Sequence, residues 1–65
     1  MERRWMSAEI IPEKADVFRQ FLIENGFKYE PSSCFNLVHF EVYLNNEEAK
    51  RVERFLMDEV WHTTL

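Results

Sequence analysis

The sequence has few of the residues that small proteins use for crosslinks and sharp turns: 65 residues include one cysteine, one glycine and two prolines. A single cysteine cannot form an internal disulfide, which excludes a disulfide-stapled secreted mini-protein and favours a reducing, cytoplasmic location. One glycine excludes a glycine-rich phosphate loop. No segment approaches the roughly 20 apolar residues that cross a bilayer. Ser7 and Glu9 interrupt the segment after Arg3 and Arg4, so we expect neither a secretory signal nor membrane contact.

Positive charge is also scarce, with 8 Lys and Arg against 12 Asp and Glu and a formal net charge of −4. This balance argues against a protein that coats phosphate backbones. Lys50, Arg51 and Arg54 are interleaved with acidic residues, which indicates a solvated helix face and not a nucleic-acid patch. The charge pattern therefore disfavours a nucleic-acid partner.

Apolar residues are abundant, at 46% hydrophobic and 15% aromatic, which favours a folded chain over a disordered one. The length fits one domain spanning residues 1–65. Domains of this size bury only about 60% of the surface that their unfolded chain exposes. We therefore expect some aromatic side chains to face a partner.

The hydrophobic period changes along the first half of the chain. Residues 5–11 alternate with a period of two, with Met6, Ala8 and Ile10 on one face, which predicts a strand. Residues 12–25 repeat at three and four, which predicts a helix. Gly26 is expected to cap this helix in a left-handed conformation, with Phe27 folding back onto its last turn.

The second half predicts a hairpin and another helix. Residues 27–30 alternate, 31–33 have the composition of a turn, and 34–44 give the longest strand pattern. Asn45 and Glu48 form a capping-box pattern before a helix that ends between Asp58 and Trp61. Residues 61–65 either fray or add a short edge strand.

The order β-α-β-β-α predicts an α+β two-layer open sandwich. A right-handed crossover and a hairpin give a three-stranded sheet in the order 1-3-2, with both helices on one face. This arrangement resembles ferredoxin-like domains without their fourth strand. The free edge of the first strand leaves backbone groups unpaired, and natural proteins normally cover or pair such an edge.

The helix-free face of this sheet is expected to carry apolar and aromatic side chains between charged ones. We expect the interface anchors to be Trp5, Leu37, His39, Tyr43 and Trp61, because aromatic residues dominate interface energetics.

Catalysis and metal binding find little support. Cys34, His39 and His62 are the soft potential ligands, and neither Cys-x-x-Cys nor His-x-x-x-His is present. Cys34 and His39 have opposite parity on a strand, which argues against a nucleophile and base pair. His39 and Glu41 share a face and could hold a general base, but an open sheet face is shallow. We expect no enzyme activity, no metal and no cofactor.

The leading hypothesis is a small non-catalytic protein-interaction module that forms a homodimer through its sheet face or an edge strand, or binds another protein. Its compactness suggests an accessory protein, such as one from a mobile element. One alternative is a small-ligand-sensing regulatory domain of the ferredoxin-like type. A further alternative is weak binding of RNA or single-stranded DNA.

Overall fold

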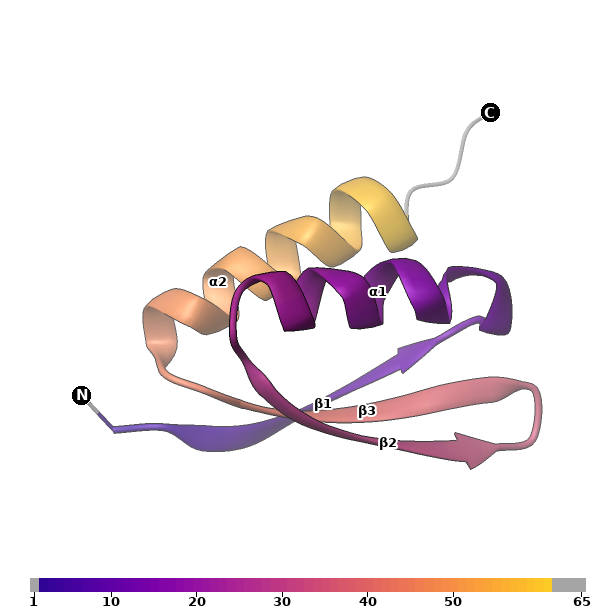
Figure 1. Cartoon of the computed structure of the whole chain (residues 1–65), viewed down its shortest axis with the longest axis horizontal. Coiled ribbons are helices and arrows are strands. Elements are labelled where there is room, and N and C mark those ends of the chain that lie inside the picture. The colour runs from indigo at the N-terminus through magenta and orange to yellow at the C-terminus, as the bar shows by residue number, and fades with distance from the viewer. Residues whose placement is uncertain (1, 62–65) are drawn as a thin grey trace.

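A computed structural model describes residues 2–61 of the chain. In chain order the elements are β1 (Arg4–Ile10), α1 (Pro12–Glu24), β2 (Lys28–Cys34), β3 (Leu37–Leu44), α2 (Asn46–Phe55) and a terminal π-helical turn, η1 (Leu56–Val60) (Figure 1). The strands form one antiparallel sheet in the order β1-β3-β2. The predicted α+β fold with strand order 1-3-2 is confirmed.

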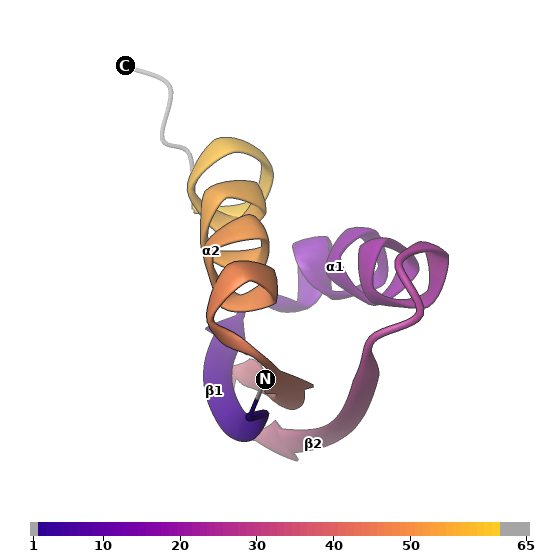
Figure 2. The same ribbon diagram turned by 90° about the vertical axis from the view of Figure 1, so that its left-hand side faces the viewer.

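Both helices cover the same side of the sheet (Figure 1). Viewed along the long axis of the molecule, α2 lies above β1, and α1 lies toward the β2 side (Figure 2). The opposite side of the sheet has no helix over it among residues 2–61. None of the helices described is long and apolar enough to span a membrane.

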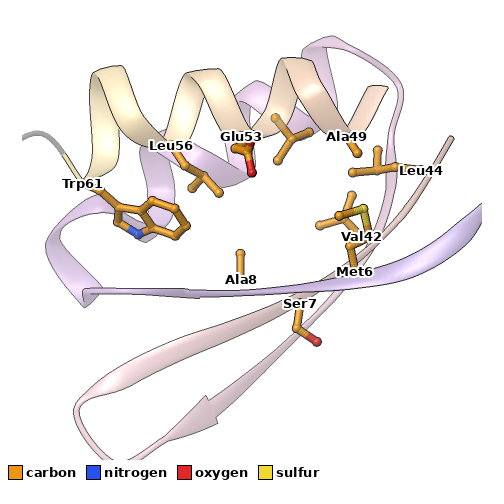
Figure 3. Close-up of a pocket in the computed structure, with 10 residues that line it drawn as sticks. Met6, Ser7, Ala8, Val42, Leu44, Ala49, Glu53, Leu56 and Trp61 are labelled. Atoms are coloured by element: carbon orange, nitrogen blue, oxygen red, sulfur yellow. The ribbon is translucent and has the colours of Figure 1, made fainter. Parts of the chain in front are cut away.

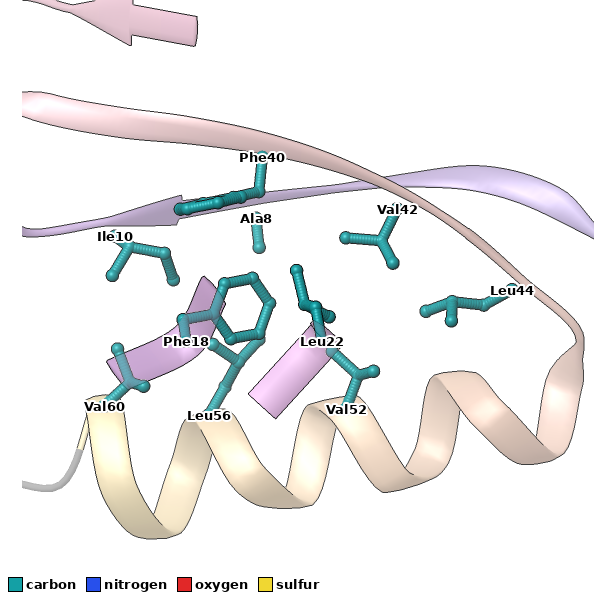
Figure 4. Close-up of a cluster of buried hydrophobic side chains, with 10 residues drawn as sticks. All are labelled: Ala8, Ile10, Phe18, Leu22, Phe40, Val42, Leu44, Val52, Leu56 and Val60. Carbon is teal, nitrogen blue, oxygen red and sulfur yellow. The ribbon is translucent and has the colours of Figure 1, made fainter. Parts of the chain in front are cut away.

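The core lies between the sheet and the two helices (Figure 4). The ring of Phe18 from α1 meets the ring of Phe40 from β3 edge to face, with centroids 5.0 Å apart and planes at 82°. Side chains from β1, α1, β3, α2 and η1 make up the buried set: Ala8, Ile10, Phe18, Leu22, Phe40, Val42, Leu44, Val52, Leu56 and Val60.

The hairpin differs from the expected one. The sequence predicts a turn over residues 31–33, but β2 continues through Pro31 to Cys34, and the turn is Phe35-Asn36. Pro31 is tolerated because β2 is an edge strand, where a missing N–H can face solvent. The strand is therefore longer and the turn tighter than the composition suggested.

Phe35 occupies an unfavourable position at the tip of this hairpin. Its φ is +55°, in the left-handed region, and its side chain is 102% exposed. Left-handed backbone costs a non-glycine residue about 1–2 kcal/mol, and no packing offsets that cost here. Two-residue hairpin turns of this kind favour glycine at the first central position.

We therefore expect Phe35→Gly to raise the free energy of unfolding by about 1 kcal/mol, measured by urea denaturation. The matched control is Asn36→Gly, whose backbone φ is not positive, so that glycine there brings only its entropic cost. Equal effects of the two substitutions would contradict this interpretation.

The helix termini follow the predicted signals. Gly26 has φ +71° and its N–H donates to the Ile23 carbonyl at 3.1 Å, while the Phe27 N–H donates to the Leu22 carbonyl at 2.9 Å. The ring of Phe27 packs against Phe21 with centroids 6.2 Å apart. The left-handed cap and the folded-back phenylalanine are both confirmed.

At the start of α2 the capping box is complete. The Glu48 N–H donates to Asn45 Oδ1 at 2.8 Å, and the Asn45 N–H donates to Glu48 Oε1 at 3.0 Å. Arg3 donates twice to the same carboxylate, at 3.1 and 3.0 Å. These bonds, first the one from the Arg3 side chain and then the one from the Asn45 backbone, lower the pKa of Glu48.

Asn45→Ala should lower the free energy of unfolding by about 1 kcal/mol, since it removes the acceptor for the Glu48 N–H. Denaturation midpoints in urea measure the effect. Asn46→Ala serves as the control, because Asn46 is exposed at the next position and makes no capping bond. A loss as large in this control would show that the cap contributes nothing specific.

Candidate interaction surfaces at the open sheet face and the β1 edge

The helix-free side of the sheet, here called the open face, has an aromatic end. Trp5 on β1 and Tyr43 on β3 are directly paired, with ring centroids 5.2 Å apart. They remain 44% and 37% exposed. Leu37 and His39 lie further along the same face of β3 and are half-buried. The structure thus brings four of the five expected anchor residues onto one face.

The middle of the open face is acidic. His39 lies between two carboxylates, with Nε2 3.6 Å from Glu41 and Nδ1 3.9 Å from Glu9. Glu30 on β2 is directly opposite Glu41. Two carboxylates directly opposite each other on neighbouring strands destabilise a sheet, so this pair does not contribute to the stability of the fold.

The predicted His39–Glu41 neighbourhood is therefore real, and it borders a shallow depression. Glu30, Pro31 and Ser32 line this depression together with His39 and Glu41. Within residues 2–61 there is no group of three or more His, Cys, Asp or Glu side chains that could hold a metal ion. The sequence allows a fourth strand in residues 61–65; Trp61 is in a bend, and His62 with the rest of that segment lies outside the described part of the chain.

Trp61 lies apart from the other four expected anchors. A π-helical turn, in which the Trp61 N–H donates to the Leu56 carbonyl at 2.5 Å, ends the last helix. The indole Nε1 then donates to the Glu9 carbonyl of β1 at 3.4 Å. Trp61 is 49% exposed and lies at the free edge of β1, on the helix side of the sheet. π-Helical turns are rare and occur frequently at functional sites.

A cavity of about 100 Å³ lies beside Trp61, between β1 and α2 (Figure 3). We call it the edge cavity; it is lined by Met6, Ser7, Ala8, Val42, Leu44, Ala49, Val52, Glu53, Leu56 and Trp61. Met6 shares a strand face with the buried Ala8 and Ile10 but is itself 40% exposed. The small side chains of Ala8 and Ala49 leave the space that Met6 does not fill. Glu53 is the only charged residue in the lining.

The register shows which backbone groups of β1 face away from β3. A two-residue turn makes Cys34 and Leu37 a hydrogen-bonded pair, so odd-numbered residues of β3 bond to β2 and even-numbered ones to β1. The even-numbered residues of β1 therefore bond to β3. The backbone groups of Trp5, Ser7 and Glu9 point to the free edge, in agreement with the bond from Trp61 to the Glu9 carbonyl.

The two edges of the sheet differ in their protection. By the same alternation the nitrogen of Pro31 faces the free edge of β2, where it removes the central donor. Prolines and charged residues of this kind are how natural proteins block an edge strand. β1 has no proline between Arg4 and Ile10, and its charged residues, Arg4 and Glu9, lie toward its two ends. Trp61 bonds to the Glu9 carbonyl, but the edge-directed backbone groups of Trp5 and Ser7 remain available to pair.

The sequence pointed to the free edge of the first strand but not to Glu53 or the edge cavity. Glu53 follows Ala49 by four residues, which places both on one helix face, but only the packing of α2 over β1 turns that face toward the edge. No protein-family model matches the chain, and comparisons with characterised proteins and with solved structures give no match. Its function is therefore proposed from the fold, the open face and the β1 edge.

Proposed function

We propose that this protein is a small non-catalytic protein-interaction module that binds an extended segment of another protein along the edge of β1. The observation that carries the proposal is the contrast between the two sheet edges. The edge of β2 is blocked by Pro31, whereas Trp5 and Ser7 present unpaired backbone groups beside an apolar cavity. Trp61 holds the Glu9 carbonyl at the end of β1. Strand addition uses main-chain hydrogen bonds for affinity and pockets for alternate side chains for specificity.

The position of α2 supports a single strand as the occupant. α2 lies above β1 and so flanks the free edge of the sheet on the helix side (Figure 2). A strand paired with β1 would direct every second side chain into the edge cavity, toward Ala49, Glu53 and Leu56. Burial of Met6 by that strand would remove one of the largest apolar side chains from solvent.

Homodimerisation, which the sequence suggests, stays a prediction, and two geometric facts bear on it. Because α2 lies above β1 (Figure 2) and neighbouring strands are only about 4.8 Å apart, joining two β1 edges would crowd the two α2 helices, whose packing needs about 8–10 Å. Packing two open faces together would bury Glu9, Glu30 and Glu41 from both copies. A foreign strand on the β1 edge meets neither obstacle.

The test is panning of a random ten-residue peptide library, displayed on phage, against the full chain. We expect enriched peptides to alternate apolar and polar residues. Their binding should be lost in Ser7→Pro, which removes one edge-directed N–H, and kept in Ser7→Val, which retains it. Fluorescence anisotropy with synthetic copies of the enriched peptides measures both variants.

Two results would overturn the proposal. The first is that no peptide is enriched, or that enriched peptides bind Ser7→Pro as tightly as the unaltered chain. The second comes from light scattering: a dimer that Ser7→Pro converts to a monomer would identify a second copy, and not a foreign strand, as the occupant of the edge.

A further inference from the structure

We infer that the strand bound at β1 presents a lysine or arginine, flanked two residues away on each side by apolar residues, to Glu53 in the edge cavity. This inference rests on the proposed function and names the chemistry of the partner. The cavity combines one carboxylate with a lining that is otherwise apolar except for Ser7. A partner side chain that points into the cavity must therefore both pack against apolar residues and pair with a carboxylate.

Glu53 is suited to receive a charge from outside the chain. Its side chain extends from α2 toward the cavity (Figure 3). It makes no hydrogen bond or ion pair with the other described residues, whereas Glu48 on the same helix is occupied by Arg3 and Asn45. A strand that covered this edge would take Glu53 out of water, and a carboxylate removed from water needs a cationic or donor partner.

Lysine and arginine meet both requirements of the cavity. Their methylene stems pack along apolar surface while the charged end reaches a polar group. The stem would lie against Ala8 and Leu56 and the charged end would reach the carboxylate of Glu53. Inward-facing residues on either side of the basic one would lie near Met6 and Trp61, where apolar side chains fit. The net charge of −4 favours the approach of such a basic segment.

Two synthetic peptides test this inference on the full chain. One is fluoresceinyl-Thr-Val-Thr-Lys-Thr-Val-Thr-amide, labelled at its N-terminus for anisotropy, and the other has Glu in place of Lys. We expect the Lys peptide to bind about tenfold more tightly than the Glu peptide at low salt. Glu53→Lys should reverse the preference. Glu47→Lys makes the same charge change on an exposed residue of α2 outside the cavity lining and should leave it unchanged.

The outcomes separate this inference from the proposed function. If both peptides bind with equal affinity, and Ser7→Pro abolishes both, the strand site stands and the role of Glu53 is wrong. If Glu47→Lys reverses the preference as well as Glu53→Lys does, net charge and not the cavity sets the specificity, and the inference is also wrong. If neither peptide binds, the inference fails, and panning alone then decides the proposed strand site.

Discussion

Phe18→Ala is expected to leave most of the chain unfolded in the absence of denaturant. Phe18 is 0% exposed and its ring meets Phe40 edge to face. Truncation of a buried phenylalanine costs about 3–5 kcal/mol. Domains hold roughly 0.05–0.15 kcal/mol per residue, which gives about 3–10 kcal/mol for this length. The cost is therefore comparable with the whole stability of the fold.

Urea denaturation followed by circular dichroism measures this effect. The matched control is Ile23→Ala on the same helix, because Ile23 is 54% exposed and its loss should change the free energy of unfolding by no more than about 0.5 kcal/mol. A cooperative transition in Phe18→Ala with the midpoint of the unaltered chain would show that this ring does not hold α1 on the sheet.

Features set by neighbouring residues could be predicted from the sequence. The left-handed cap of α1 depends on Gly26, the one glycine in the sequence, because glycine adopts positive φ without steric cost. The start of α2 depends on Asn45 and Glu48, which are three residues apart. The strand order followed from connection lengths and handedness, and not from any one residue. Each of these determinants is contained in a short segment or in a general topological rule.

The hairpin could not be placed because its local signals point to the wrong residues. Pro31, Ser32 and Ser33 are common in turns, but strand pairing across β2 and β3 overrides that preference. The actual turn places Phe35 at positive φ, where composition alone predicts glycine or asparagine. The longer pairing with β3 outweighs the unfavourable backbone at one residue.

The edge site depends on tertiary packing that no local pattern encodes. Met6 alternates with Ala8 and Ile10 as a core residue would, but α2 does not cover it fully. Trp61 reaches β1 from the end of a π-helical turn, which the sequence pattern did not predict. The high aromatic content predicted exposed aromatic side chains on one surface. In the fold the expected aromatic anchors lie on two: Trp5 and Tyr43 on the open face, and Trp61 at the β1 edge.

Ala8→Pro and Ser7→Pro, one residue apart, are expected to lower the free energy of unfolding by very different amounts. The Ala8 N–H points to β3, and proline at this position removes the donor to the Phe40 carbonyl. Phe40 is only 2% exposed. An unsatisfied buried carbonyl and the intruding ring together should cost about 3 kcal/mol or more. Ser7→Pro removes a donor that faces solvent and should cost no more than about 1 kcal/mol.

Thermal and urea denaturation of the two variants measures this difference, with Ser7→Val as the control for loss of the hydroxyl. We expect Ala8→Pro to be largely unfolded, and Ser7→Pro to unfold cooperatively near the unaltered chain. The reverse order would mean that Ala8 and not Ser7 faces the free edge, and the Ser7→Pro binding test would then lose its basis. Because strand hydrogen bonds alternate, one pair of prolines therefore tests both the fold and the edge on which the proposed function depends.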